Sequence, residues 1–270
     1  KEKITKPAFI FSLLFFTGFT SMAMEVIWTR AFTPILLNTI YSFASLLTAY
    51  FFATWAGVVL YRTHLKRRRI ISTENLLVAL AAFALLPVLV NDPRFIISVP
   101  LALTSIFPFC AGLGYLTPKL IDEYSAGYPS EAGKAYSLNI AGCVIGPVFA
   151  SYILLPAWGV KYSLIFLSVP FLLFFMSCSL KIFFSTIRFS AVVIMITCMM
   201  LAASLINISY EDVYVAPESG SNGQEYYVLP DNSVVRRDHT ATVISMGEGM
   251  SKMLLIDGIG TTSLRTLTKM

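Results

Sequence analysis

The chain has 270 residues, of which 56% are hydrophobic and only 13% carry a charge. Because soluble domains carry about 25% charged residues, this composition excludes an ordinary soluble domain. A mean hydropathy of +0.73 and a formal net charge of +5 indicate instead an integral membrane protein with a small basic excess.

Apolar runs fill the first three quarters of the sequence. A helix that crosses a bilayer needs about 20 mostly apolar residues. No irregular backbone can face lipid, so we expect every such run to form a helix packed on the others. Pro108 predicts a kink in the fourth run. In chain order the runs are Pro7–Arg30, Pro34–Arg62, Asn75–Val90, Pro93–Ile121, Ala135–Trp158, Tyr162–Leu180 and Phe189–Asn207.

The character of the sequence changes near Ile208. From there on, short alternating segments such as Thr240–Ser245 are separated by turn residues such as Asp257 and Gly258, a pattern typical of β-hairpins. We therefore predict a membrane all-α fold, a bundle of about seven transmembrane helices within residues 1–207. A small β-hairpin-rich extramembrane segment is expected to follow in residues 208–270.

The basic residues predict an orientation in the membrane. They precede the first run and gather between the second and third, fourth and fifth, and sixth and seventh runs, most densely at Arg62 and Lys66–Arg69. Lys and Arg mark the cytoplasmic side of a span. We expect a multi-pass membrane protein with a cytoplasmic N-terminus. After an odd number of spans, the C-terminal segment lies on the opposite side of the membrane. The dense basic group can also bind anionic lipid headgroups, whereas nucleic acid is not an expected partner.

Four polar side chains in the membrane region are candidate substrate-binding residues, namely Glu25, Arg30, Tyr41 and Asn139. Charged groups at membrane depth are costly and often mark a functional site. One alternative is that Glu25 and Arg30 lie at the membrane interface. The other is that the Asn139 side chain only forms a hydrogen bond between two helices. We find no catalytic constellation and no metal-binding pattern in the sequence.

Gly142 and Gly146 have the GxxxG spacing that lets two membrane helices approach closely. Gly112 and Gly114 are interpreted in the same way. All four cysteines lie inside apolar runs without a ligand-like spacing, so they are expected to be small packing residues.

Several segments of the chain together resemble the bacterial membrane-bound spermidine synthase-like proteins, which join a transporter-like helical half to a spermidine synthase-like domain. In the tail, the similarity is to the β-hairpin region that opens a spermidine synthase fold. The segments that carry the resemblance are Glu25–Arg30, Tyr41–Ala44, Tyr136–Gly146, Leu154–Gly159, Arg237–Val243 and Leu254–Gly260.

The resemblance implies that the glycine-rich cofactor turn and the acidic catalytic residues of the family follow the hairpin, beyond these residues. The chain would then serve as a membrane anchor or assembly module, with a protein partner or a second copy of itself beside the lipid bilayer. The alternative is a transporter, or a membrane protein that binds a polyamine-like or other small ligand at Glu25, Arg30 and Asn139. The sequence specifies no cofactor and leaves open whether the protein is an enzyme.

Overall fold

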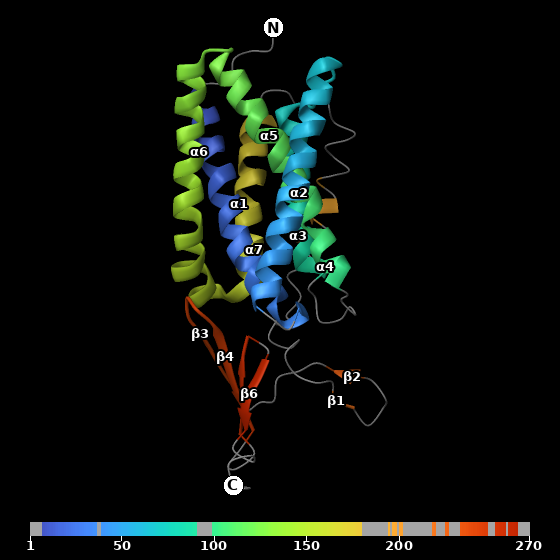
Figure 1. Ribbon diagram of the computed structural model, residues 1–270, viewed down its shortest axis with the longest axis vertical. Helices are drawn as coiled ribbons and strands as arrows, with labels where there is room; N and C mark the ends of the chain where they lie inside the picture. Colours follow the sequence, from blue (N-terminus) through green and yellow to red (C-terminus); the bar gives the residue numbers. More distant parts are fainter. Residues whose placement is uncertain are drawn as a thin grey trace.

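The computed structural model describes residues 7–36, 39–90, 99–179, 194, 196–198, 200–201, 218–219, 225–226, 233–247, 252–257 and 259–263. Long helices lie side by side in a bundle, and a small antiparallel sheet lies against one end of it (Figure 1). The helix α1 begins at the opposite end of the bundle from the sheet (Figure 1). The expected order of a helical region followed by a β-rich segment is therefore confirmed.

The helices account for the first six apolar runs. Among the residues described, five helical stretches are long and apolar enough to cross a membrane, and the last of them, Pro129–Cys178, contains two of the predicted runs. The helices are α1 Pro7–Leu36, α2 Thr39–Lys66, α3 Thr73–Val90, α4 Val99–Ser105, α5 Phe107–Ser125, α6 Pro129–Phe149, the π-helix η1 Ala150–Leu154 and α7 Leu155–Ser179.

Two helix boundaries differ from the prediction at the first connection. The helix α1 continues past Arg30 to Leu36, and α2 begins only at Thr39. Pro34 was expected to open the second run, but it lies in the last turn of the first helix. Proline fixes its own φ near the helical value, so it does not by itself mark the start of a new element.

The fourth run bends as its proline predicts. The helix breaks at Ile106 between α4 and α5, and Pro108 occupies the first turn of α5, where its missing N–H costs nothing.

The fifth and sixth predicted runs are two helices, as expected. The helix α6 starts at Pro129 and leads through η1 into the first residues of α7, where the helix is kinked. On either side of the kink, α6 and α7 each run along the bundle (Figure 1). The kink lies at Gly159, with φ 67° and ψ −174°, a conformation open mainly to glycine.

The seventh predicted run lies mostly outside the described residues. Those of its residues that are described are helical, and Ile194, Met200 and Leu201 pack against the core of the bundle. Residues 202–217 are not described, so the expected boundary between 207 and 208 stays a prediction.

Glycines set the closest helix crossings, as the sequence predicts. A Cβ at Gly142 or Gly146 of α6 would lie 2.1 Å or 2.2 Å from the carbonyl oxygen of Phe15 or Phe19 in α1. Between α2 and α5, a Cβ at Gly114 would lie 2.3 Å from the Thr54 carbonyl oxygen. Small residues allow two membrane helices to come into backbone contact, and dispersion then stabilises the pair.

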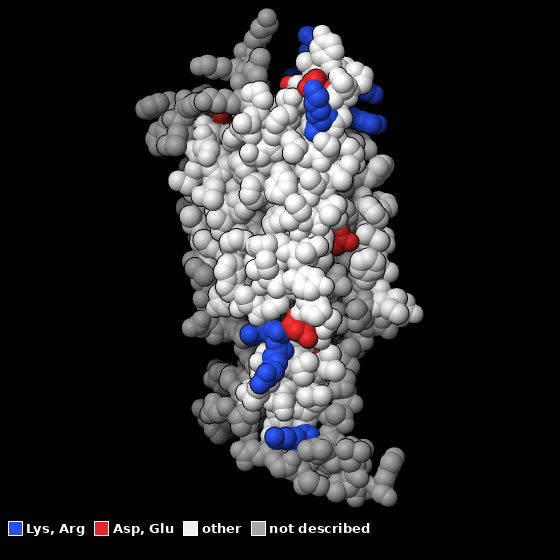
Figure 2. Space-filling view, turned by 90° about the vertical axis from the view of Figure 1, so that its left-hand side faces the viewer, with Lys and Arg blue, Asp and Glu red and all other residues white. Residues whose placement is uncertain are grey.

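The surface between the two ends of the bundle suits lipid. On the face drawn in Figure 2, basic side chains gather at the end of the bundle away from the sheet and again towards the sheet. The broad band between them shows no basic side chain, although an acidic side chain is visible in it. The helix α2 exposes Phe51, Phe52 and Trp55 within this region, as expected of side chains that face hydrocarbon.

The larger sheet is an antiparallel meander in the order β3-β4-β5-β6. Its register pairs Val235 with Ile244 and Ile244 with Leu255, and the last two side chains are buried. The predicted hairpin of Thr240–Ser245 with the strand that ends at Ile256 is thus confirmed, while β6 was not predicted. The strands are β3 Val234–Arg237, β4 Thr242–Met246, β5 Met253–Ile256 and β6 Ile259–Ser263, with a separate pair of β1 Glu218–Ser219 and β2 Glu225–Tyr226.

We predict that Gly146→Ala destabilises the bundle by about 1–3 kcal/mol, because the new methyl group forces α1 and α6 apart. Thermal unfolding of the detergent-solubilised protein measures the change. The matched control is Gly133→Ala in the first turns of α6, where an added Cβ meets nothing within 4 Å. The control should unfold at the wild-type temperature or above it, since Ala favours a helix over Gly. Equal behaviour of the two variants would contradict the close crossing.

Candidate functional site

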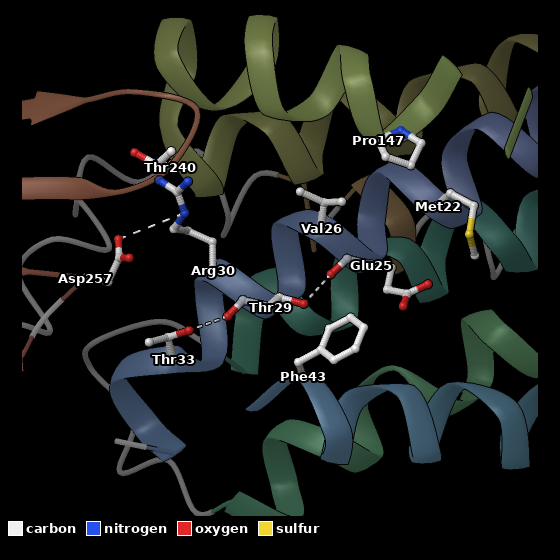
Figure 3. A pocket seen from close by; sticks show the side chains of 10 residues that line it. All are labelled: Met22, Glu25, Val26, Thr29, Arg30, Thr33, Phe43, Pro147, Thr240 and Asp257. Atoms are coloured by element: carbon white, nitrogen blue, oxygen red, sulfur yellow. Dashed lines mark hydrogen bonds and ion pairs between the residues drawn. The ribbon is translucent and has the colours of Figure 1, made fainter. Parts of the chain in front are cut away.

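A cavity of about 350 Å³ lies where the helical bundle meets the sheet. The helix α1 forms most of its wall, and α2, α6 and the strand connections of the sheet supply the rest (Figure 3). Its lining residues are Met22, Glu25, Val26, Thr29, Arg30, Thr33, Phe43, Pro147, Thr240 and Asp257.

Arg30 joins the bundle to the sheet. It donates from Nη2 to the carbonyl oxygen of His239 at 3.1 Å and from Nη1 to that of Asp238 at 3.4 Å. Its Nε lies 4.0 Å from Oδ1 of Asp257. Because Arg30 is only 8% exposed, these partners replace most of the water that a guanidinium would otherwise bind. A charge-assisted hydrogen bond is worth about 1.5–3 kcal/mol.

The β3–β4 turn is rigid enough to receive this cation. One carboxylate oxygen of Asp238 accepts hydrogen bonds from the amides of Thr240 and Ala241, at 2.7 and 2.8 Å, and from the Thr240 hydroxyl at 2.6 Å. This Asx turn fixes the backbone whose carbonyls face Arg30.

A second set of contacts holds the same turn. The ring of His239 stacks on Tyr152 of η1, with centroids 4.9 Å apart and planes 12° from parallel. At the kink after η1, a Cβ at Gly159 would lie 3.1 Å from Nε of Arg237. The π-helix and the kink thus bring α6 and α7 against the hairpin.

Asp257 links the two halves of the sheet. Its Oδ1 accepts from the amide of Thr242 at 2.7 Å, and its own amide donates to the Thr242 carbonyl at 2.9 Å. The backbone at Asp257 has a φ of 47°, which suits the turn before β6 and is tolerated by Asp.

Glu25 lies on the other side of the cavity. Its carboxylate points away from Arg30 (Figure 3), and among the described residues no hydrogen bond or ion pair reaches it. The side chain is half-buried. The Thr29 hydroxyl donates to the Glu25 backbone carbonyl at 2.9 Å, and Thr33 donates likewise to Thr29 at 2.7 Å. These hydroxyls satisfy their own protons on the helix and still offer lone pairs to a ligand.

Asn139 belongs to a different cavity of about 380 Å³, formed between α1, α2, α5 and α6. Its amide donates to the Leu14 carbonyl at 2.9 Å and lies 3.1 Å from the Thr17 hydroxyl. The Asn139 side chain therefore joins α6 to α1 by hydrogen bonds, which is the structural alternative given in the sequence analysis. Ser21 and the Tyr50 hydroxyl, 2.8 Å apart, line the same cavity.

The structure thus brings together Glu25 and Arg30 of the four candidate residues. Tyr41 is 69% exposed on α2 and lines neither cavity. Sequence reasoning missed Asp257 and Thr240, which come from the far end of the chain. The Asp238–Thr240 turn signal could have drawn attention to this hairpin, but nothing in the sequence pairs it with Arg30.

The ionisable groups of the hairpin have shifted pKa values. Hydrogen bonds from the Thr240 hydroxyl and from two backbone amides lower the pKa of Asp238 to about 2. Burial raises the pKa of Asp257 above its ordinary value, although the Thr242 amide and Arg30 act in the opposite direction.

The lining of the cavity at Arg30 offers groups that can bind a ligand. Among the described residues, no group of His, Cys, Asp or Glu is arranged to hold a metal ion. The cavity offers two carboxylates, hydroxyl oxygens and an apolar wall, which fit a ligand that donates hydrogen bonds. Comparisons with protein-family models, with characterised proteins and with solved structures gave no match to this chain.

We predict that the β3–β4 turn loosens as the pH falls from about 4 to about 2. The folded pKa of Asp238 lies below the ordinary aspartate value of 3.8, so its contribution to stability is present above that value and is lost as the carboxylate protonates. Asp257, with a raised pKa, does not contribute to this loss. The loosening of the turn is measured by the hydrogen-exchange protection of the Thr240 and Ala241 amides. Asp238→Asn keeps an acceptor oxygen and should show a flat profile, whereas the same decline in both proteins would contradict the assignment.

Proposed function

We propose that this protein is a membrane anchor that holds a spermidine synthase-like segment in a fixed position at one end of a helical bundle. The observation that carries the proposal is the Arg30 side chain, which is buried between the bundle and the β3–β4 turn. A flexible tether would need no such contact. The spermidine synthase-like character of the hairpin rests on the resemblance of its sequence.

We also propose the bacterial inner membrane as the location, with the N-terminus in the cytoplasm and the sheet in the periplasm. The basic residues Arg62 and Lys66–Arg69 support this orientation, because they lie at the end of the bundle away from the sheet (Figure 1). Lys and Arg favour the cytoplasmic face.

Arg30→Met tests the anchor. It retains an unbranched apolar side chain but removes every donor, so the hairpin should lose about 1.5 kcal/mol or more of local stability. The amides of the β3–β4 turn should then exchange at least about tenfold faster. Arg62→Met, an exposed arginine at the other end of the bundle, serves as the control. If Arg30→Met leaves hairpin exchange at the wild-type rate, the sheet is not held through this residue and the anchor proposal fails.

A second candidate function is the binding of a cationic, polyamine-like small molecule at Glu25. The observation that favours it is the half-buried carboxylate without a partner among the described residues. A charge in such a position needs a counter-charge or a proton. The neighbouring walls are apolar at Val26 and Phe43, as a ligand with an aliphatic chain requires.

Glu25→Gln should weaken the binding of spermidine or a similar amine at least about tenfold, since it removes the one carboxylate free to pair with it. Calorimetry on the purified protein gives the dissociation constants. Glu131→Gln is the control, because Glu131 pairs with Lys134 at 2.7 Å on the surface of α6. Unaltered affinity for every amine tested would remove this candidate.

A further inference from the structure

Five cations lie in the eight residues that end α2 and lead into α3. Arg62, Lys66, Arg67, Arg68 and Arg69 all have exposed side chains. This basic turn lies at the end of the bundle opposite the sheet (Figure 1). A positive-inside signal alone needs only the charges, not a defined arrangement of them.

The backbone of the basic turn is a regular helix cap. The amide of Arg69 donates to the His64 carbonyl at 2.9 Å, and the amide of Arg68 donates to that of Leu65 at 3.2 Å. This is the Schellman pattern, in which the residue after the cap adopts a left-handed conformation and is usually glycine. Here that residue is Arg68, with a φ of 54°. An arginine therefore occupies a position where its backbone is disfavoured, which points to a use for its side chain.

The side chain of Tyr115 also stabilises the turn. The amide of Ile71 donates to the hydroxyl of Tyr115 at 3.0 Å, and the same hydroxyl lies 3.2 Å from Nδ1 of His64. Tyr115 is buried in α5. The backbone that carries the cations is thus already held by hydrogen bonds at both ends. Binding an anion therefore costs little backbone conformational entropy.

The acidic groups of α5 nearby have other partners. Asp122 accepts from the Tyr61 hydroxyl at 2.8 Å, and Glu123 pairs with Lys119 at 2.8 Å. Within the described part of the chain, no ion pair neutralises the five cations of the turn. Their positive charge remains available to an external anion.

Two apolar side chains flank the charges. Leu65 and Ile70 are each 45% exposed, on either side of the Arg67–Arg69 segment. This mixture fits the boundary between headgroups and acyl chains. We propose that the basic turn is a binding site for the phosphate of an anionic phospholipid in the adjacent leaflet.

The test compares purified protein in nanodiscs of phosphatidylcholine alone with protein in nanodiscs that also contain phosphatidylglycerol. The wild type should unfold at a higher temperature in the anionic discs and should retain phosphatidylglycerol in native mass spectrometry. A variant with Gln at positions 67, 68 and 69 should bind this lipid about a hundredfold more weakly, and it should lose the temperature difference.

Arg68→Gly separates a structural role from a binding role. It relieves the left-handed backbone, so in neutral discs it should unfold at the wild-type temperature or above it. In anionic discs its unfolding temperature should rise by less than that of the wild type, and it should retain the lipid about fivefold more weakly. Arg236→Gln, an exposed change on β3, should leave both measurements unaltered.

Three results would overturn the proposal. Phosphatidylglycerol could stabilise the wild type and the triple variant equally. Arg68→Gly could lose stability in neutral discs and retain full lipid binding. Free glycerol phosphate, at matched ionic strength, could reproduce the effect in neutral discs, which would make this a site for soluble phosphate instead of lipid.

Discussion

A guanidinium buried at the end of a helical bundle must find acceptors, and this requirement determines how the two parts of the protein meet. Arg30 finds them in the backbone of a turn 208 and 209 residues further along the chain. Removing a charge from water costs several kcal/mol unless hydrogen bonds compensate. The Asx turn at Asp238, the stacking of His239 on Tyr152 and the hydrogen bonds of Asp257 all hold that acceptor backbone in place.

The same helix that carries Arg30 also carries a polar stripe. Thr17, Ser21, Glu25, Thr29 and Thr33 follow one another at intervals of four residues, so the stripe winds around α1 by about 40° at each step. The first two line the cavity at Asn139, and the other three line the cavity beneath the sheet. The spacing of Ser21 and Glu25 is one helical turn, about 6 Å along the axis. The sheet therefore lies at one end of a polar stripe that winds along α1 and lines both cavities.

Much of the fold could be predicted because its causes are local. Apolar length predicts the helices, Pro108 the break near Ile106 and Gly142 with Gly146 the close crossing of α6 on α1. The separation of the fifth and sixth runs was predicted as well, and Gly159 alone forms the kink between them. For the site, charge at membrane depth drew attention to Glu25 and Arg30. Asn139 lies in a different cavity, and Asp257 joins Glu25 and Arg30 from another part of the chain. Both facts depend on tertiary packing, which no local sequence pattern predicts.

The fixed position of the sheet on the bundle can be measured directly by pulsed electron paramagnetic resonance. Spin labels at Val148→Cys on α6 and Val234→Cys on β3, both exposed sites, would be placed in a variant that lacks the four native cysteines. A sheet held by Arg30 should give a single narrow distance distribution in lipid at neutral pH. A broad distribution, as a flexible tether would give, would contradict it.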